Sequence, residues 1–432
     1  MYEIMKKFEF TGETKTINLL FGTATLHRIR AVAKFGFVEI GELGGWIEKE
    51  ENLSHEENAW VYGDAKVYGN AKVYGNAEVR DKAEVCGNAI VYGNAKVGAD
   101  AKVYGKAGVY GNAEVCGNAK VYGNAKVGED AEVYDNAEVC GNAEVCGNAQ
   151  IYDNAEVYDK AEVYGNAQIY GNAKVRADAK VYGKAEVCGK AGVRGKAEIW
   201  DDAKVYDNAI VCEDANVYGN AQIYGNAKVR ADAKVYGKAG VCGKAEVRGK
   251  AEIRDDANVY GNANVYGNAK IYGNAKVYDN AKVWDDAKVY DNAEVCGNAK
   301  VWEDAKVYVN AKVYSNAEVY SNAKVYGNAK VYGNAEVCGK AEVCGKAEVF
   351  STRHVLVIGT IGSQDDFATF YRDKDNEITV KCGYFLDKID KFLEKVTETH
   401  GDSNYALVCR AAVEAARLQI DLSNEVTKDA DE

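Results

Sequence analysis

The chain has 432 residues, a formal net charge of −12 and no proline. The acidic balance argues against a general nucleic-acid binder, because such proteins hold phosphates with a basic surface. No run approaches the roughly 18 apolar residues that a membrane-spanning helix needs, and the N-terminus MYEIMKKFEF has no apolar signal core. Twelve cysteines without a signal sequence predict reduced thiols and a cytoplasmic location.

Residues 1–58 predict a small β-rich N-terminal cap. The segments KTINLLFG, TLHRIRAVAKF and FVEIGEL predict short strands, and they are separated by glycine-containing turns. Trp46 and Trp60 are predicted to cover the open core of the first repeat.

Residues 59–350 repeat one six-residue motif, Val-Tyr-Gly-Asn-Ala-Lys. Every sixth residue from Val61 to Val349 is Val or Ile, and every sixth residue from Ala59 to Ala347 is Ala, with 49 of each and no interruption. A fixed short period is the signature of a solenoid. Six residues do not match the turn of a helix, but they fit a short strand followed by a tight corner. Val and Ala are therefore predicted to point inward, and Lys or Glu, Tyr or Cys, and Asn to point outward.

The tandem [Ile/Val]-x-x-x-Ala-x pattern resembles the hexapeptide-repeat family of left-handed parallel β-helices. This resemblance implies an all-β solenoid of about 16 triangular coils, with three hexads in each 18-residue coil. Residues 167–208 recur almost unchanged at 221–262, an offset of 54 residues that equals three such coils. The stretch RIRAVAKFGFVEIGELGGWIEKEENLS resembles the N-terminal region of a bacterial hexapeptide-repeat family labelled as transferases, and repeat proteins of phages and prophages.

Outward residues that are 18 positions apart are expected to form columns along the solenoid. Tyr follows the inward Val or Ile 27 times, and the neighbouring positions often hold Lys. The first interpretation is that such aromatic ladders stabilise a sheet face. The second is a surface for a protein partner, and the third is a surface for single-stranded nucleic acid, which acidic corner residues oppose. The candidate partner-binding residues are Tyr272, Tyr290, Tyr308, Tyr326, Trp284, Trp302, Lys270, Lys288, Lys306 and Lys324.

Residues 351–432 predict a small α+β domain that caps the solenoid. RHVLVIGTIG, ATFYRD and ITVKCGYF predict strands, and LDKIDKFLEKVTETHG has helical apolar spacing that ends at Gly401. YALVCRAAVEAARLQI predicts a last helix before an acidic tail. The segment GTIGSQDDF lacks the glycine pattern and the lysine of a phosphate loop, so we interpret it as an ordinary turn.

Acyltransferases of the hexapeptide family use a histidine near the coils as general base, a loop that interrupts the repeat and a cleft between subunits. The four histidines of this chain lie outside the hexads, and no loop interrupts the repeats. His55, beside the first coil, is the one weak candidate base. No metal site is predicted, because the ten repeat cysteines never stand 18 residues apart and the three-histidine zinc site of the family's carbonic anhydrases has no counterpart.

These observations favour a non-catalytic, rigid β-helical scaffold of bacterial or phage origin. It would present its end domains or its Tyr/Lys-rich side to a protein partner, without nucleic acid, membrane or cofactor. The alternative is a divergent acyltransferase that acts at a subunit cleft with acetyl-CoA. Both a homotrimer, which would match that assembly, and a dimer stay open. A filament former of the bactofilin type is disfavoured, because non-repeat domains are expected to cover both ends.

Overall fold

The computed structural model describes residues 6–423, so the last part of the predicted acidic tail lies outside the described residues. The chain divides into two compact units, one up to Tyr218 and one from Gly219. The first unit holds the N-terminal cap and part of the repeats, and the second holds the remaining repeats and the C-terminal α+β domain.

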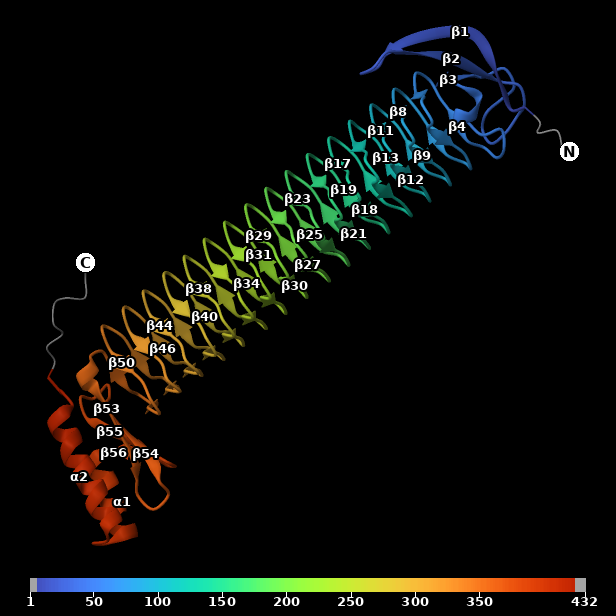
Figure 1. The fold of residues 1–432 in the computed structure, drawn as a ribbon. Helices are drawn as coiled ribbons and strands as arrows, with labels where there is room; N and C mark the ends of the chain where they lie inside the picture. The colour runs from blue at the N-terminus through green and yellow to red at the C-terminus, as the bar shows by residue number, and fades with distance from the viewer. Residues whose placement is uncertain (1–5, 424–432) are drawn as a thin grey trace. The chain divides into compact units, whose positions relative to one another are not determined.

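Each hexad contributes a two-residue strand that consists of Val or Ile and the residue before it (Figure 1). These strands run from β4 (Trp60–Val61) to β30 (Asn216–Val217) in the first unit, and from β31 (Gln222–Ile223) to β52 (Glu348–Val349) in the second. A strand pairs in parallel with the third strand after it, so that Lys72 of β6 (Lys72–Val73) lies opposite Ile90 of β9 (Ile90–Val91). Each unit therefore contains a left-handed parallel β-helix with 18-residue coils, which confirms the predicted fold.

The core of the repeats is a stack of aliphatic side chains. The inward Val, Ile and Ala residues of the hexads are at most 1% exposed, and the outward residues are mostly half-buried or exposed, as predicted. Burying one valine stabilises a fold by about 1.5–3 kcal/mol. Because every coil packs only on its neighbours, the stability of the repeats is close to a sum of coil–coil terms.

The corners depend on a left-handed backbone at the glycine position and on asparagine ladders. Gly69 has φ +69°, and an added Cβ would lie 3.1 Å from the backbone nitrogen and oxygen of Gly87 in the next coil. The Asn76 side-chain amide donates a hydrogen bond to Asn94 at 3.0 Å, and the Asn94 amide donates to Asn112 at 2.9 Å. Gly-Asn thus supplies both the bend and a bond to the coil above.

The N-terminal cap is a sheet that joins the first coil. Strand β1 (Phe8–Asn18) pairs antiparallel with β2 (Thr23–Ala31), and β2 pairs with β3 (Leu43–Ile47), which runs parallel to β5 (Lys66–Val67). A short 3-10 helix, η1 (Glu50–Asn52), follows. The prediction of a strand over FVEIGEL is wrong: residues 37–42 form turns, because the backbone at Gly41 has φ +87° and returns the chain to β2.

Ile47 and Leu53, and neither tryptophan, close the open core of the first coil. Ile47 lies opposite Val67, Leu53 lies opposite Val73, and both side chains are at most 1% exposed. Trp46 occupies an outward position opposite Lys66, and Trp60 is buried on the outer side beneath the rings of Phe8 and Phe35. The predicted covering role of the two tryptophans is therefore wrong, because their side chains lie on the opposite side of the strand from the core.

The C-terminal domain is a four-stranded antiparallel sheet with two helices on one face. Its strands are β53 (Val355–Ile361), β54 (Asp366–Arg372), β55 (Ile378–Cys382) and β56 (Phe385–Lys388), in that order. Helix α1 (Ile389–His400) ends at Gly401, as predicted, and is followed by α2 (Asn404–Gln419). The segment ITVKCGYF is a hairpin and not one strand, because Gly383, with φ +53°, turns the chain into β56.

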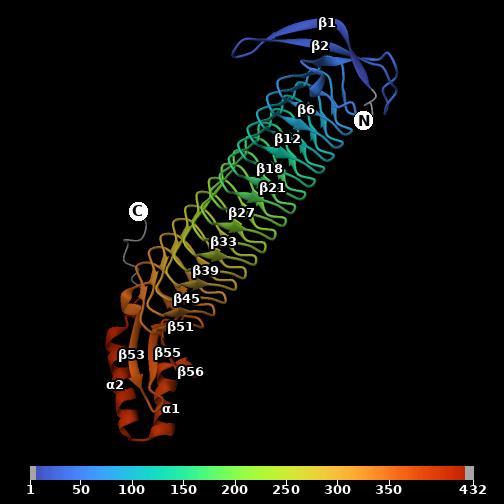
Figure 2. The same cartoon turned by 45° about the vertical axis from the view of Figure 1, so that its right-hand side comes forward.

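Figure 2 shows the domain at the end of the last coils, which confirms the predicted C-terminal cap, and β54 is the strand that contacts those coils. Phe370 packs into the core beneath the helices with Phe392, whereas Thr369 and Tyr371 face the repeats. The backbone N–H of Glu342 donates to Thr369 Oγ1 at 2.9 Å, and the Tyr371 hydroxyl lies 3.4 Å from Cys344 Sγ. One face of β54 thus packs in the core of the C-terminal domain, and its other face packs on the repeats.

Candidate partner-binding groove

In the second unit, the predicted tyrosine column is a continuous stack on one face of the solenoid. It follows β39 (Lys270–Ile271), β42 (Lys288–Val289), β45 (Lys306–Val307) and β48 (Lys324–Val325). The ring centroids of Tyr272, Tyr290, Tyr308 and Tyr326 are 4.8, 4.8 and 4.9 Å apart. The rings cover one another, so ring edges and hydroxyl groups remain for a partner. A nucleic-acid base, which binds by stacking on a free ring face, finds no such face between them.

Both ends of this stack have a partner of their own. The Arg254 guanidinium lies 4.7 Å from the ring centroid of Tyr272, a cation–π contact. At the other end Cys344 follows Tyr326 in the column, and its Sγ contacts the Tyr371 hydroxyl. Burial is the main cause that raises the pKa of Tyr290 and Tyr308 to about 12. These phenols are therefore neutral hydrogen-bond donors at physiological pH.

Four lysines stand next to one another beside the tyrosine column. Lys270, Lys288, Lys306 and Lys324 are direct neighbours in the parallel strand pairs, and this is the longest lysine run at that position of the repeat. The two outer lysines have carboxylate partners, Lys270 with Glu252 at 3.5 Å and Lys324 with Glu342 at 2.7 Å. Within residues 6–423, Lys288 and Lys306 have no carboxylate within ion-pair distance. Like charges that lie opposite each other destabilise a sheet.

The lysine run forms one wall of a groove of about 460 Å³, and the C-terminal domain forms the other wall. Five lysines and three carboxylates line it, so the groove is net positive. Lys340 Nζ lies 4.6 Å from the ring centroid of Phe367, and Lys381 Nζ lies 3.7 Å from Glu342. The lining residues are Lys288, Asp304, Lys306, Asn322, Lys324, Lys340, Glu342, Asp366, Phe367, Lys381 and Gly383.

The structure brings three of the predicted lysines together with residues that sequence reasoning missed. One feature of the sequence distinguishes Lys340: it replaces the asparagine that is usual at the corner. No sequence feature indicates that Lys381 and Phe367 belong to the groove, because their position there follows from the docking of β54 on the last coils.

The predicted tryptophans lie on the neighbouring face and do not line the groove. Trp284 and Trp302 follow β41 (Lys282–Val283) and β44 (Lys300–Val301), and their rings stack at 4.8 Å. Tyr266 and Tyr320 extend the stack at either end. These rings form a second aromatic column in which the ring faces cover one another. Lys300 beside it is paired with Glu318 at 2.7 Å.

His55, the weak candidate base, has both ring nitrogens engaged within the N-terminal cap. The backbone N–H of Lys7 donates to Nδ1 at 3.1 Å, and Nε2 lies 2.9 Å from Glu50 Oε1. The ring stacks on Phe8 with a centroid distance of 4.3 Å. The backbone donor fixes the tautomer with its proton on Nε2, so both nitrogens of this imidazole are used in contacts within the cap.

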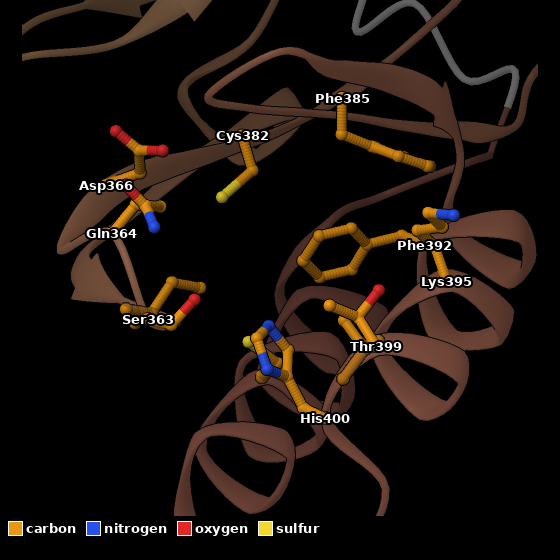
Figure 3. Close-up of a pocket in the computed structure, with 13 residues that line it drawn as sticks. Ser363, Gln364, Asp366, Cys382, Phe385, Phe392, Lys395, Thr399 and His400 are labelled. Atoms are coloured by element: carbon orange, nitrogen blue, oxygen red, sulfur yellow. The ribbon is translucent and has the colours of Figure 1, made fainter.

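A second, smaller cavity of about 130 Å³ lies within the C-terminal domain (Figure 3). Phe385 and Phe392 contribute apolar walls, and His400 and the turn with Ser363 lie at its rim. The turn that we interpret as ordinary therefore lines a cavity. Burial, with Asp366 nearby, raises the pKa of the Cys382 thiol to about 11, so this thiol is protonated and a poor nucleophile at neutral pH.

A comparison of the chain with protein-family models and with curated protein sequences finds no match. Among the described residues, no helix combines the length and the apolar character that a bilayer crossing requires. The site is therefore interpreted from its own chemistry: a net positive groove, two lysines without a carboxylate partner among the described residues, and a column of stacked tyrosines beside the lysine run.

Proposed function

We propose that the protein is a non-catalytic scaffold whose groove, between the lysine run and the C-terminal domain, binds an acidic segment of a partner protein. The observation that carries this proposal is the pair Lys288 and Lys306, which are neighbours in adjacent coils and lack carboxylate partners among the described residues. Carboxylates from a partner would supply the missing counter-charges.

The charge pattern of the repeats supports a binding role for this pair. Most other lysines at this position in the second unit have a glutamate in an adjacent coil, as with Lys312 and Glu294 at 3.0 Å and Lys330 and Glu348 at 3.0 Å; Lys282, between Asn264 and Lys300, is an exception. A lysine run gives up that stabilisation, which is about 0.2–1 kcal/mol for each exposed pair. The longest lysine run at this repeat position thus lies where the groove is.

The rigidity of the tyrosine column beside the lysine run also favours binding. The stacked rings of Tyr290 and Tyr308 beside the lysines are half-buried, so they lose little conformational freedom when a partner docks. Phe367 adds an apolar contact on the opposite wall. An acidic segment with interspersed apolar residues would match both walls.

The proposal includes the finer points of origin and location. We place the protein among the hexapeptide-repeat β-helices of bacteria or phages and in the cytoplasm. All twelve cysteines are free, which agrees with a reducing compartment.

The test is binding of a fluorescent peptide rich in Asp and Glu to the full chain, measured by anisotropy at low and at physiological salt. The test variant is Lys288→Gln/Lys306→Gln. Its matched control is Lys276→Gln/Lys282→Gln, which removes the same charge from two exposed lysines at the same repeat position on the other two faces.

We expect the test variant to weaken binding at least tenfold and the control to leave it within about twofold. Binding should also fall with salt, because the contacts are between exposed charges. Equal losses in the two variants would show a response to net charge alone and would contradict a specific groove. Undetectable binding by the unmodified chain at low salt would contradict the proposal as a whole.

A further inference from the structure

The first unit contains a basic hollow that the proposed function does not use. It has a volume of about 500 Å³ and lies over β20 (Glu156–Val157), β23 (Lys174–Val175), β26 (Gly192–Val193) and β29 (Ile210–Val211). Gly192 creates it: an ideal Cβ built there meets no atom within 4 Å. The outward side chain that most other hexads carry at this position is missing, and the backbone forms the floor.

Four cationic side chains line the hollow, and no carboxylate does. They are Lys174, Arg176, Lys190 and Arg194, and the ring of Tyr158 and two corner asparagines complete the lining. Glu156, outside the hollow, pairs with Lys174 at 2.9 Å. Arg176 donates a hydrogen bond to the Tyr158 hydroxyl at 3.1 Å. Within the described part of the chain, Arg176, Lys190 and Arg194 form no ion pair, so three positive charges converge without compensation.

The duplicated segment of the chain supplies an internal comparison. Residues 167–208 recur at 221–262, and Arg176, Gly192 and Arg194 correspond to Arg230, Glu246 and Arg248. In that copy, Glu246 forms an ion pair with Arg230. Arg248 lies 4.9 Å from the ring centroid of Tyr266, whereas the residue that follows Arg194 in its column is Cys212. The second copy thus pairs Arg230 with a carboxylate and places Arg248 against an aromatic ring, whereas in the first copy neither Arg176 nor Arg194 has a carboxylate partner among the described residues.

We infer that the hollow at Gly192 is a binding site for a small phosphate-bearing anion, such as a phosphate monoester or pyrophosphate. Arginine guanidinium groups match the oxygen geometry of phosphate with paired N–H donors. Three uncompensated charges suit a ligand with two or more negative charges. Gly192, by its lack of a side chain, lets the anion approach the backbone, and Ile210 offers an apolar border for the rest of the ligand.

The experiment is calorimetric titration of the full chain with pyrophosphate at low ionic strength. Gly192→Glu recreates the carboxylate of the second copy. The control is Gly108→Glu, the same change at the same repeat position in β12 (Gly108–Val109), where an added Cβ also meets no atom within 4 Å. Glu246→Gly opens the second copy. Thermal unfolding of each variant checks that the fold is retained.

The expected result is one pyrophosphate per chain, at least tenfold weaker binding in Gly192→Glu, unchanged binding in Gly108→Glu, and a second bound pyrophosphate in Glu246→Gly. Undetectable binding by the unmodified chain at millimolar pyrophosphate would overturn the inference, as would equal binding in Gly192→Glu. Failure of Glu246→Gly to gain a site would overturn the role of that carboxylate. A single-stranded oligonucleotide that binds more tightly, with the same sensitivity to Gly192→Glu, would replace the small anion by nucleic acid.

Discussion

Lys288 and Lys306 are direct neighbours in the parallel pair β42 and β45, and the residues beyond them in the column are again lysines. A surface column of this kind stores electrostatic repulsion in the free protein. A site shaped for binding has a stability cost that a purely structural column avoids. Stability and binding are therefore expected to respond in opposite directions to one substitution.

Lys306→Glu should raise the free energy of unfolding by about 0.5–1 kcal/mol, because the new carboxylate lies between Lys288 and Lys324. The same change should abolish binding of the acidic peptide. Denaturant unfolding and peptide anisotropy on one preparation measure both effects. A stability gain with unchanged peptide binding would separate the lysine run from the groove.

Interrupting the tyrosine stack should destabilise the second unit. Tyr308→Ala removes two stacked contacts, at 4.8 and 4.9 Å, and should cost about 1–3 kcal/mol. It should also reduce the near-ultraviolet circular dichroism of the coupled rings. Tyr164→Ala is the control, because no ring lies stacked on Tyr164 among the described residues, and it should cost less. Equal costs would show that burial of each ring, and not stacking, accounts for the effect.

The side chains that close the first coil should be more sensitive than exposed residues of the same type. Ile47→Ala removes a fully buried side chain that covers Val67 and should cost about 2–4 kcal/mol. Ile40→Ala, where the side chain is 69% exposed, should change stability by less than about 0.5 kcal/mol. Thermal unfolding of the two variants makes the comparison. Similar costs would contradict the assignment of Ile47 as the cover of the core.

Acid should weaken the junction between the last coil and the C-terminal domain. Burial, with Arg372 nearby, lowers the pKa of His354 from 6.5 to about 4, and the N–H of Phe350 donates to its Nδ1 at 3.3 Å. Between pH 6.5 and 4 the unfolded chain therefore binds more protons than the folded chain. The free energy of unfolding should fall over that window, by about 3 kcal/mol from this residue.

The variant His354→Asn tests this assignment, because its amide oxygen accepts the same backbone hydrogen bond without titrating. Its unfolding free energy should fall less steeply between pH 6.5 and 4 than that of the unmodified chain. Identical slopes would assign the acid sensitivity to carboxylates elsewhere.

The repeat architecture could be predicted from the sequence because one period determines both the strand and the corner. Val67 and Ala71 point inward because a two-residue strand and a left-handed glycine leave no other arrangement. The cover of the first coil was harder to predict, since Ile47 and Leu53 keep the six-residue spacing but Val61 follows Leu53 at a spacing of eight. That shift hides the continuation of the core into the cap.

The groove and the hollow were predictable to different degrees. The lysine column follows from the 18-residue coil, so Lys288 and Lys306 could be named in advance. The opposite wall could not, because Lys381 reaches the groove only through the tertiary contact of β54 with β51 (Glu342–Val343) and β52. The hollow at Gly192 could not be predicted from that glycine alone. Its interpretation as a site depends on the surrounding arginines and on the comparison with the duplicated segment.

The parallel pairing of residues 18 apart also constrains how the gene can change in length. Loss or gain of 18 residues leaves every later strand on its own face and shifts the columns and charge pairs by one coil. Loss or gain of six or twelve residues moves every later strand to a different face and separates the tyrosines of one column. The 54-residue offset between the duplicated segments obeys this rule. Unequal recombination among such repeats is thus expected to be tolerated in steps of 54 nucleotides, because each later strand keeps its face of the solenoid.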